Sequence, residues 1–231
     1  MSSNLLAELN KYFHGRHLHP SPAWLQSFIS GARTNMPLPA LQKTALFRLL
    51  ATDITTSMIP PSTSLLPDNI LNGTLPSRSV TGPIVCQVFD IEDIGHSRWS
   101  QVETIEAKER GETTKGREII RVTSEEEGNG ATAHTSAAES KGPFKLLLQD
   151  AKGLKIYAYD LHGIEGLNNN MAIGIKLTLK SLEVRRGVIM LDPAHTQVLG
   201  GKIEALDKAW KDGKKERFLA AAREGRVDGD A

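Results

Sequence analysis

Apolar residues over the first 59 positions recur at the three- and four-residue spacing of a helix face. The first such face is formed by Leu5, Leu6, Leu9, Tyr12 and Phe13. A second helix is predicted to begin after Ser21, which can cap it ahead of Pro22, and to end at Gly31. A third is predicted over residues 37–54. Because three short amphipathic helices can bury their apolar faces only by packing together, residues 1–59 are predicted to form a small bundle that rests on the chain that follows.

After a connector rich in Pro, Ser and Asn (residues 60–79), the apolar period shortens to two, which is typical of strands. Strands are predicted at residues 83–91, 144–149, 154–159, 175–180, 182–191 and 196–199, with a tight turn inside the fifth segment. Gly153 is expected to take a positive φ in the hairpin turn before the third strand. A strand, a hairpin, an interruption and a second hairpin make the order of an OB-fold, a small closed barrel, over residues 80–201. The predicted class is α+β, completed in residues 202–231 by a C-terminal helix and tail, with the helix broken or bent at Gly213.

An insertion of unusual length interrupts the predicted barrel between its first two strands, at residues 95–142. Its distal part, residues 123–142, has no large apolar residue and is predicted to be disordered, because it cannot offset the entropy of ordering. The remainder holds apolar residues that are expected to order on the barrel or on a partner: Trp99, Val102, Ile105, Ile119 and Ile120. Two interpretations stay open, a tolerated surface insertion and an arm that engages a partner.

The composition indicates a folded, intracellular chain. Its apolar fraction of 39% and charged fraction of 24% are those of a globular protein, and its one cysteine, Cys86, excludes a disulfide framework. The formal net charge of +1 combines +3 in residues 1–79, −5 in residues 80–142 and +3 in residues 143–231. A total this close to zero argues against nucleic-acid binding by bulk electrostatics alone. Since the chain has neither an apolar run of membrane-spanning length nor a signal-peptide pattern, we expect no membrane partner.

Catalytic motifs are missing from the sequence, including the phosphate-binding loop, the dinucleotide fingerprint and the zinc-protease and serine-hydrolase signatures. His14, His17 and His19 have a spacing conceivable for metal ligands, but no nearby cysteine or carboxylate completes a set, so exposed imidazoles at a helix end are the favoured interpretation. Asp192 and His195 are interpreted as turn residues rather than as an acid–base pair. We therefore expect no enzyme activity, no metal and no cofactor.

Lys155, Tyr157 and Tyr159 form a candidate DNA-binding face, because they share one side of the third predicted strand. OB-folds bind single strands through aromatic and basic residues on their second and third strands. The alternation does not decide which side faces solvent, since Ile156 and Ala158 could equally point inward. An aromatic fraction of 5% is low for a stacking platform, so single-stranded DNA binding by the chain alone is the second choice of function.

Several stretches resemble one known family. The run from Val184 to Pro193, continued from Val198 to Ile203, is similar to the N-terminal OB-fold of the RecQ-mediated genome instability protein family, the Rmi-type subunit. The pair Gly174 and Lys176 is similar to that family's Gly-x-Lys. Upstream pieces resemble the family's helical region, namely Trp24-Leu25, Leu49–Ile54 and Leu66-Pro67. The hairpin turn at residues 148–153 is longer than the family's, and the chain resembles the short form with one OB-fold.

The resemblance implies a non-catalytic subunit of a complex between a type IA topoisomerase and a RecQ-type helicase. In the family this complex dissolves double Holliday junctions during DNA recombination, replication and repair, which implies a nuclear location and a role in genome stability. The family's insertion reaches into the topoisomerase gate, so the resemblance assigns gate contacts to Trp99, Val102, Ile105, Ile119 and Ile120. It also assigns topoisomerase contacts to Gly174 and Lys176, with Lys176 expected on the polar side of its strand. DNA is expected to bind mainly through the complex.

Overall fold

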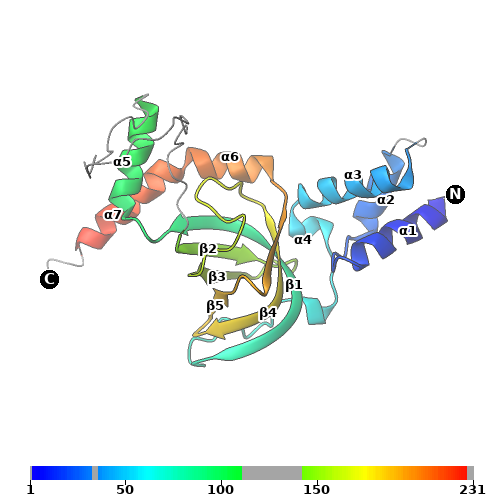
Figure 1. The fold of residues 1–231 in the computed structure, drawn as a ribbon, viewed down its shortest axis with the longest axis horizontal. Coiled ribbons are helices and arrows are strands. Elements are labelled where there is room, and N and C mark those ends of the chain that lie inside the picture. Colours follow the sequence, from blue (N-terminus) through cyan, green and yellow to red (C-terminus); the bar gives the residue numbers. More distant parts are fainter. Residues whose placement is uncertain (1, 33–35, 111–141, 228–231) are drawn as a thin grey trace, which may run out of the picture. The chain divides into compact units, whose positions relative to one another are not determined.

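The computed structural model of the protein describes residues 2–32, 36–110 and 142–227 (Figure 1). The chain divides into two compact units. The first comprises residues 1–95 and 141–211 and holds a helical bundle and a β-barrel, and the second comprises residues 96–140 and 212–231. No helix among the described residues is long and apolar enough to cross a membrane.

The N-terminal bundle contains helices α1 (Ser2–His14), α2 (Pro22–Ser30), α3 (Leu38–Leu50) and the short α4 (Ile54–Ser57). The predicted ends of α2 are confirmed, because the Ser21 hydroxyl accepts the Trp24 N–H at 3.2 Å and Gly31 is the C-terminal cap. The predicted length of the third helix is wrong: the chain leaves α3 after Leu50, and Asp53 caps α4. The bundle core consists of Leu9, Phe13, Leu18, Leu25, Phe28, Leu41, Ala45, Leu49, Ile54 and Met58, together with Val85 of the first strand.

In the described part of the chain, six strands follow the bundle: β1 (Arg78–Asp93), β2 (Phe144–Gln149), β3 (Lys155–Asp160), β4 (Lys176–Arg185), β5 (Val188–Leu191) and β6 (Thr196–Gly200). Their order is β1-β2-β3-β5-β4, and β1 also pairs with β4, so these five strands close into a barrel while β6 pairs with β4. The β3–β5 pair is parallel and the other pairs are antiparallel. This connectivity is that of an OB-fold and confirms the predicted α+β class.

Two tight turns set the barrel register. Arg186 and Gly187 form the connection between β4 and β5 with φ values of 48° and 78°, as a two-residue hairpin turn requires. A Cβ on Gly187 would lie 2.8 Å from the Leu71 carbonyl oxygen, so a side chain has no room there. The positive φ predicted for Gly153 is confirmed at 95°. The two strands predicted at residues 175–180 and 182–191 divide differently, since β4 continues without a break until the turn.

A buried carboxylate fastens the connector between bundle and barrel. The connector contains one 3-10 turn, η1 (Ser62–Ser64). Asp150, in the turn between β2 and β3, is fully buried, and it accepts the Leu66 N–H at 3.1 Å and two N–H groups of its own turn. Leu66 and Ile70 are buried in the barrel core beside this contact. The connector is therefore held on the barrel by both polar and apolar contacts.

The second unit contains, among its described residues, the packed helices α5 (Arg98–Glu109) and α7 (Lys214–Val227). The Lys215 ammonium joins them, 2.7 Å from the Glu109 carboxylate and 3.3 Å from that of Glu106. The predicted break at Gly213 is confirmed, because this residue separates α6 (Glu204–Asp212) from α7. The first part of the insertion is thus a helix paired with the C-terminal helix of the same chain.

Candidate interaction surfaces

The candidate DNA-binding residues of β3 lie on the outer face of the barrel. Ile156 and Ala158 belong to the buried core, while Lys155 and Tyr157 are exposed and Tyr159 is half-buried. The question that the strand alternation left open is therefore answered: the two tyrosines face outward. Position on β3 also matches where OB-folds carry ligand-binding residues.

Two further side chains join this face from the neighbouring strands. Lys145 on β2 pairs with Tyr159, and its ammonium lies 4.4 Å from the centre of the Tyr157 ring. The Lys155 ammonium lies 3.6 Å from the centre of the Phe89 ring, at a β-bulge of β1 between Val88 and Asp90. We call the set Phe89, Lys145, Lys155, Tyr157 and Tyr159 the aromatic–lysine face. Its rings can stack on nucleobases and its ammonium groups can approach phosphates, a combination typical of single-strand binding surfaces.

Helix α5 presents one large apolar side chain among the predicted gate residues. Trp99 in its first turn is 52% exposed, whereas Val102 is 2% exposed and Ile105 is half-buried. Val102, to which the resemblance assigns a gate contact, is instead buried on a helix that packs against α7, where Phe218 is buried as well. Ile119 and Ile120 lie outside the described residues.

The prediction that Lys176 lies on the polar, solvent-facing side of its strand, β4, is wrong. Its side chain is fully buried, and its ammonium donates to the carbonyl oxygens of Leu50 at 2.7 Å, Thr52 at 2.7 Å and Gly174 at 2.9 Å. The reason is that the end of α3 and the segment after it cover this face of β4, so both faces of the strand are buried there. Gly174 is equally structural, because at its φ of 94° a Cβ would lie 2.7 Å from Ile203.

A polar joint surrounds the Lys176 ammonium and links the bundle to the barrel. Gln87 of β1 is fully buried; its side-chain oxygen accepts the Ile54 N–H at 3.0 Å, and its amide donates to Asp53 at 3.2 Å. Burial lowers the pKa of Lys176 to about 8, and the charge of Asp53 opposes that fall. Burial also acts to raise the pKa of Asp53, but hydrogen bonds from Thr55 and Gln87 and the charge of Lys176 outweigh it, so that pKa is lowered.

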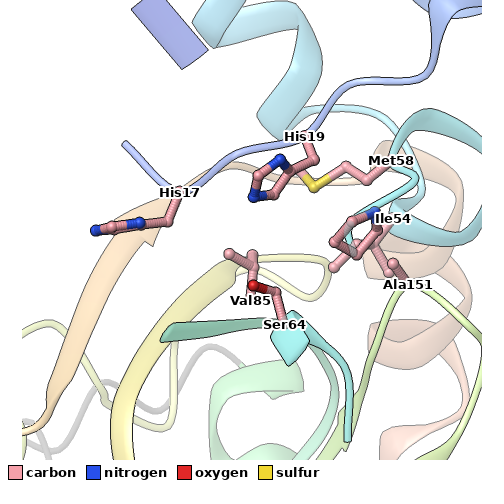
Figure 2. Close-up of a pocket in the computed structure, with 8 residues that line it drawn as sticks. His17, His19, Ile54, Met58, Ser64, Val85 and Ala151 are labelled. Atoms are coloured by element: carbon pink, nitrogen blue, oxygen red, sulfur yellow. The ribbon is translucent and has the colours of Figure 1, made fainter. Parts of the chain in front are cut away.

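A small cavity lies at the same junction, between the bundle and the barrel. Figure 2 shows the His19 ring beside Met58, with His17 farther out along the same segment. The cavity measures about 10 Å³, which is about enough for one water molecule and too little for an organic ligand. Burial, and then the charges of His14 and His17, lower the pKa of His19. Within the described ranges no three His, Cys, Asp or Glu side chains gather as metal ligands would.

Comparison with known proteins gives two matching family models. The model described as "RMI1, N-terminal helical domain" matches residues 14–57, and the one described as "RMI1, N-terminal OB-fold domain" matches residues 66–214. The first range covers α2, α3 and α4 of the bundle, and the second covers the barrel strands together with the insertion and α6.

Curated relatives carry the same family's name. RecQ-mediated genome instability protein 1 of Schizosaccharomyces pombe is 32% identical over 140 residues, which cover 56% of this chain and 60% of that protein. The proteins of that name from Gallus gallus and Mus musculus are 27% and 26% identical over 203 and 212 residues, or 85% and 88% of this chain. The aligned parts are 28% and 31% of these two relatives, so the chain spans less than two thirds of each relative's length.

Proposed function

Since the chain belongs to the RMI1 family by both its helical and its OB-fold domain, we propose that it is a non-catalytic subunit of a nuclear complex between a type IA topoisomerase and a RecQ-type helicase. In this role it stimulates decatenation and the dissolution of double Holliday junctions, and so maintains genome stability. The name of the relatives, RecQ-mediated genome instability protein 1, supports the link to a RecQ protein. The topoisomerase is proposed as a partner because of the sequence resemblance. The barrel and helix α5 supply surfaces suited to binding it.

The observation that supports this proposal most strongly is the structure of helix α5. The insertion between β1 and β2 supplies a folded helix with an exposed tryptophan, and α7 braces that helix through Lys215. A partner that binds a preformed helix does not have to order it first, so less of the contact energy is lost. Exposed Trp side chains are also among the residues that contribute most to protein–protein affinity.

Such an arm can regulate a gate only through unequal binding. A subunit without catalytic residues changes the balance between open and closed topoisomerase by preferring one of the two states, and the size of the shift equals that preference. Contacts made by the barrel would hold the partner in either state. The α5 arm, placed in the insertion, is therefore the part proposed to distinguish the two states.

The first test is binding to a purified type IA topoisomerase. We expect Trp99→Ala to weaken binding at least about tenfold, as loss of a central aromatic contact does. The matched control is Leu161→Ala, which removes a large apolar side chain that is 51% exposed at the end of β3. Equal affinity of the Trp99 variant, the Leu161 variant and the unmodified chain would contradict the proposed use of α5.

A second candidate function, single-stranded DNA binding by the barrel itself, is favoured by the aromatic–lysine face. Its test is a salt titration with a fluorescent oligothymidine and the chain alone. If the barrel itself acts on single-stranded DNA, it must bind the oligothymidine near physiological salt concentration. The affinity must also fall steeply as the salt concentration rises. This function also requires that Tyr157→Ala and Lys145→Ala weaken binding, because both residues belong to this face. A flat response to salt or unchanged affinity of both variants would exclude it.

A further inference from the structure

Two clefts lie side by side on the bundle, between α2 and α3. The first has a volume of about 350 Å³ and the second of about 250 Å³, and both are lined by Phe28 and Arg48. The other lining residues of the first are Trp24, Ser27, Phe47, Ala51 and Thr52, and those of the second are Gly31, Ala32, Met36, Leu41 and Thr44. We call the two together the α2–α3 groove. Neither the barrel face nor the α5 arm contributes a residue to it.

The groove combines two aromatic side chains of the bundle with a third, Phe47, that the bundle core does not use. Trp24 and Phe28 are stacked, with ring centres 5.6 Å apart and planes 5° from parallel. Phe47 is 74% exposed, more than any other large hydrophobic side chain in the described part of the chain. Phe47 therefore adds nothing to the bundle core, and a large apolar side chain exposed beside a cleft is typical of sites that bind another molecule.

The charge on the described residues of the groove is positive and comes from Arg48. The Arg48 guanidinium lies 5.6 Å from the centre of the Phe28 ring, and within the described residues its side chain makes no ion pair. None of the described residues that line the two clefts is acidic. The first 59 residues contain only two carboxylates, Glu8 and Asp53, and Asp53 already accepts hydrogen bonds from Thr55 and Gln87. A guanidinium stacked on a ring keeps its planar edge available for a carboxylate.

We propose that the α2–α3 groove binds an acidic linear segment of a partner protein, with a large apolar side chain in the 350 Å³ cleft and a neighbouring carboxylate on Arg48. A peptide fits better than a nucleic acid, because Arg48 is the one cation among the described residues that line the groove, and a phosphate chain needs a row of cations. The proposal concerns a different surface from the topoisomerase function. Either can therefore fail while the other holds.

The experiment is a selection of random twelve-residue peptides displayed on phage against the full chain, followed by fluorescence polarisation of the enriched peptides. We expect them to share a Leu, Phe or Trp beside an Asp or Glu. Their affinity should fall at least about tenfold in Phe47→Ser and in Arg48→Glu. The matched control is Lys43→Glu, which makes the same charge change at an exposed position of α3 that lines neither cleft. Both substituted side chains of the groove are exposed, so thermal melts should match that of the unmodified chain.

Each other outcome would overturn the proposal. Enriched peptides without acidic residues, or affinities that survive Arg48→Glu, would remove the carboxylate contact. A loss of affinity in Lys43→Glu equal to that in Arg48→Glu would indicate general charge attraction and no built site. Oligothymidine binding that Phe47→Ser abolishes would make the groove a nucleic-acid site, and a dimer in sedimentation velocity that this variant abolishes would make it a contact between copies of the chain. If the selection enriches no peptide, the groove has no such ligand.

Discussion

Replacing Lys176 by methionine tests whether one buried ammonium holds the bundle on the barrel. Methionine fills most of the same space but donates no hydrogen bond. The carbonyl groups of Leu50, Thr52 and Gly174 would then lose the donor that they share. The change acts on the folded state at the point where α3 ends above β4, and it touches no exposed surface.

Two opposing terms set the size of the effect. Each buried carbonyl left without a donor costs about 1–3 kcal/mol, so the three together cost on the order of 3–9 kcal/mol. In the other direction, methionine avoids the cost of burying a charge, which the fall in the pKa of Lys176 from 10.5 to about 8 puts at about 3 kcal/mol. We expect the first term to be larger and the variant to lose about 3 kcal/mol, or about 6–12 °C in melting temperature.

Urea denaturation of the variant at pH 7, followed by far-UV circular dichroism, measures the free energy of unfolding. The matched control is Lys180→Met on the same strand, whose side chain is exposed and whose loss should change stability by less than about 0.5 kcal/mol. A Lys176→Met chain as stable as the control, or more stable than the unmodified chain, would refute the reasoning. Any loss of partner binding in Lys176 variants is then expected to follow from the loss of folded protein.

The remaining predictions concern the core, the junction and the arm. Leu179→Asp should unfold the barrel because that side chain is 1% exposed, whereas Val198→Asp should cost less because Val198 is only partly buried; thermal melts of both variants check this order. His19 has a folded pKa below its unfolded value of 6.5, so the folded state binds its proton more weakly, and stability should fall as the pH drops below about 6.5. Urea titrations at pH 7.5 and 5.5 should show a smaller fall in His19→Gln. Phe218→Ala should raise hydrogen exchange in α5 and leave β1–β5 protected, since Phe218 belongs to the second unit.

Local signals were enough to predict most of the fold. The Ser21-Pro22 start and Gly31 end of α2 follow from capping chemistry, and the hairpin glycine follows from turn chemistry. The strands follow from their period of two. These features depend on residues close in the sequence, so the sequence alone carries them.

Features that depend on contacts between distant parts of the chain could not be predicted in the same way. Alternation assigns Lys176 to the solvent side of β4, and only the bundle, more than a hundred residues earlier, turns that side into an interior. Phe89 belongs to the aromatic–lysine face because a bulge in β1 shifts the strand register there. No pattern of residues in the sequence predicts that bulge. The α5 helix did leave a signal, since Trp99, Val102 and Ile105 are three residues apart. Its pairing with α7 depends on a segment at the other end of the chain.

The most direct test of the proposed function is single-turnover decatenation by a type IA topoisomerase in the presence of three forms of the chain. They are the unmodified protein, a chain with residues 96–141 replaced by a short Gly/Ser linker, and a chain that lacks only residues 123–142. The insertion leaves and re-enters between paired strands, so the barrel should stay folded in all three, which a thermal melt verifies. We expect the full replacement to lose stimulation to a greater extent than it loses affinity for the topoisomerase, and the shorter deletion to keep most of both. Stimulation by the full replacement equal to that of the unmodified chain would contradict gate regulation by the insertion.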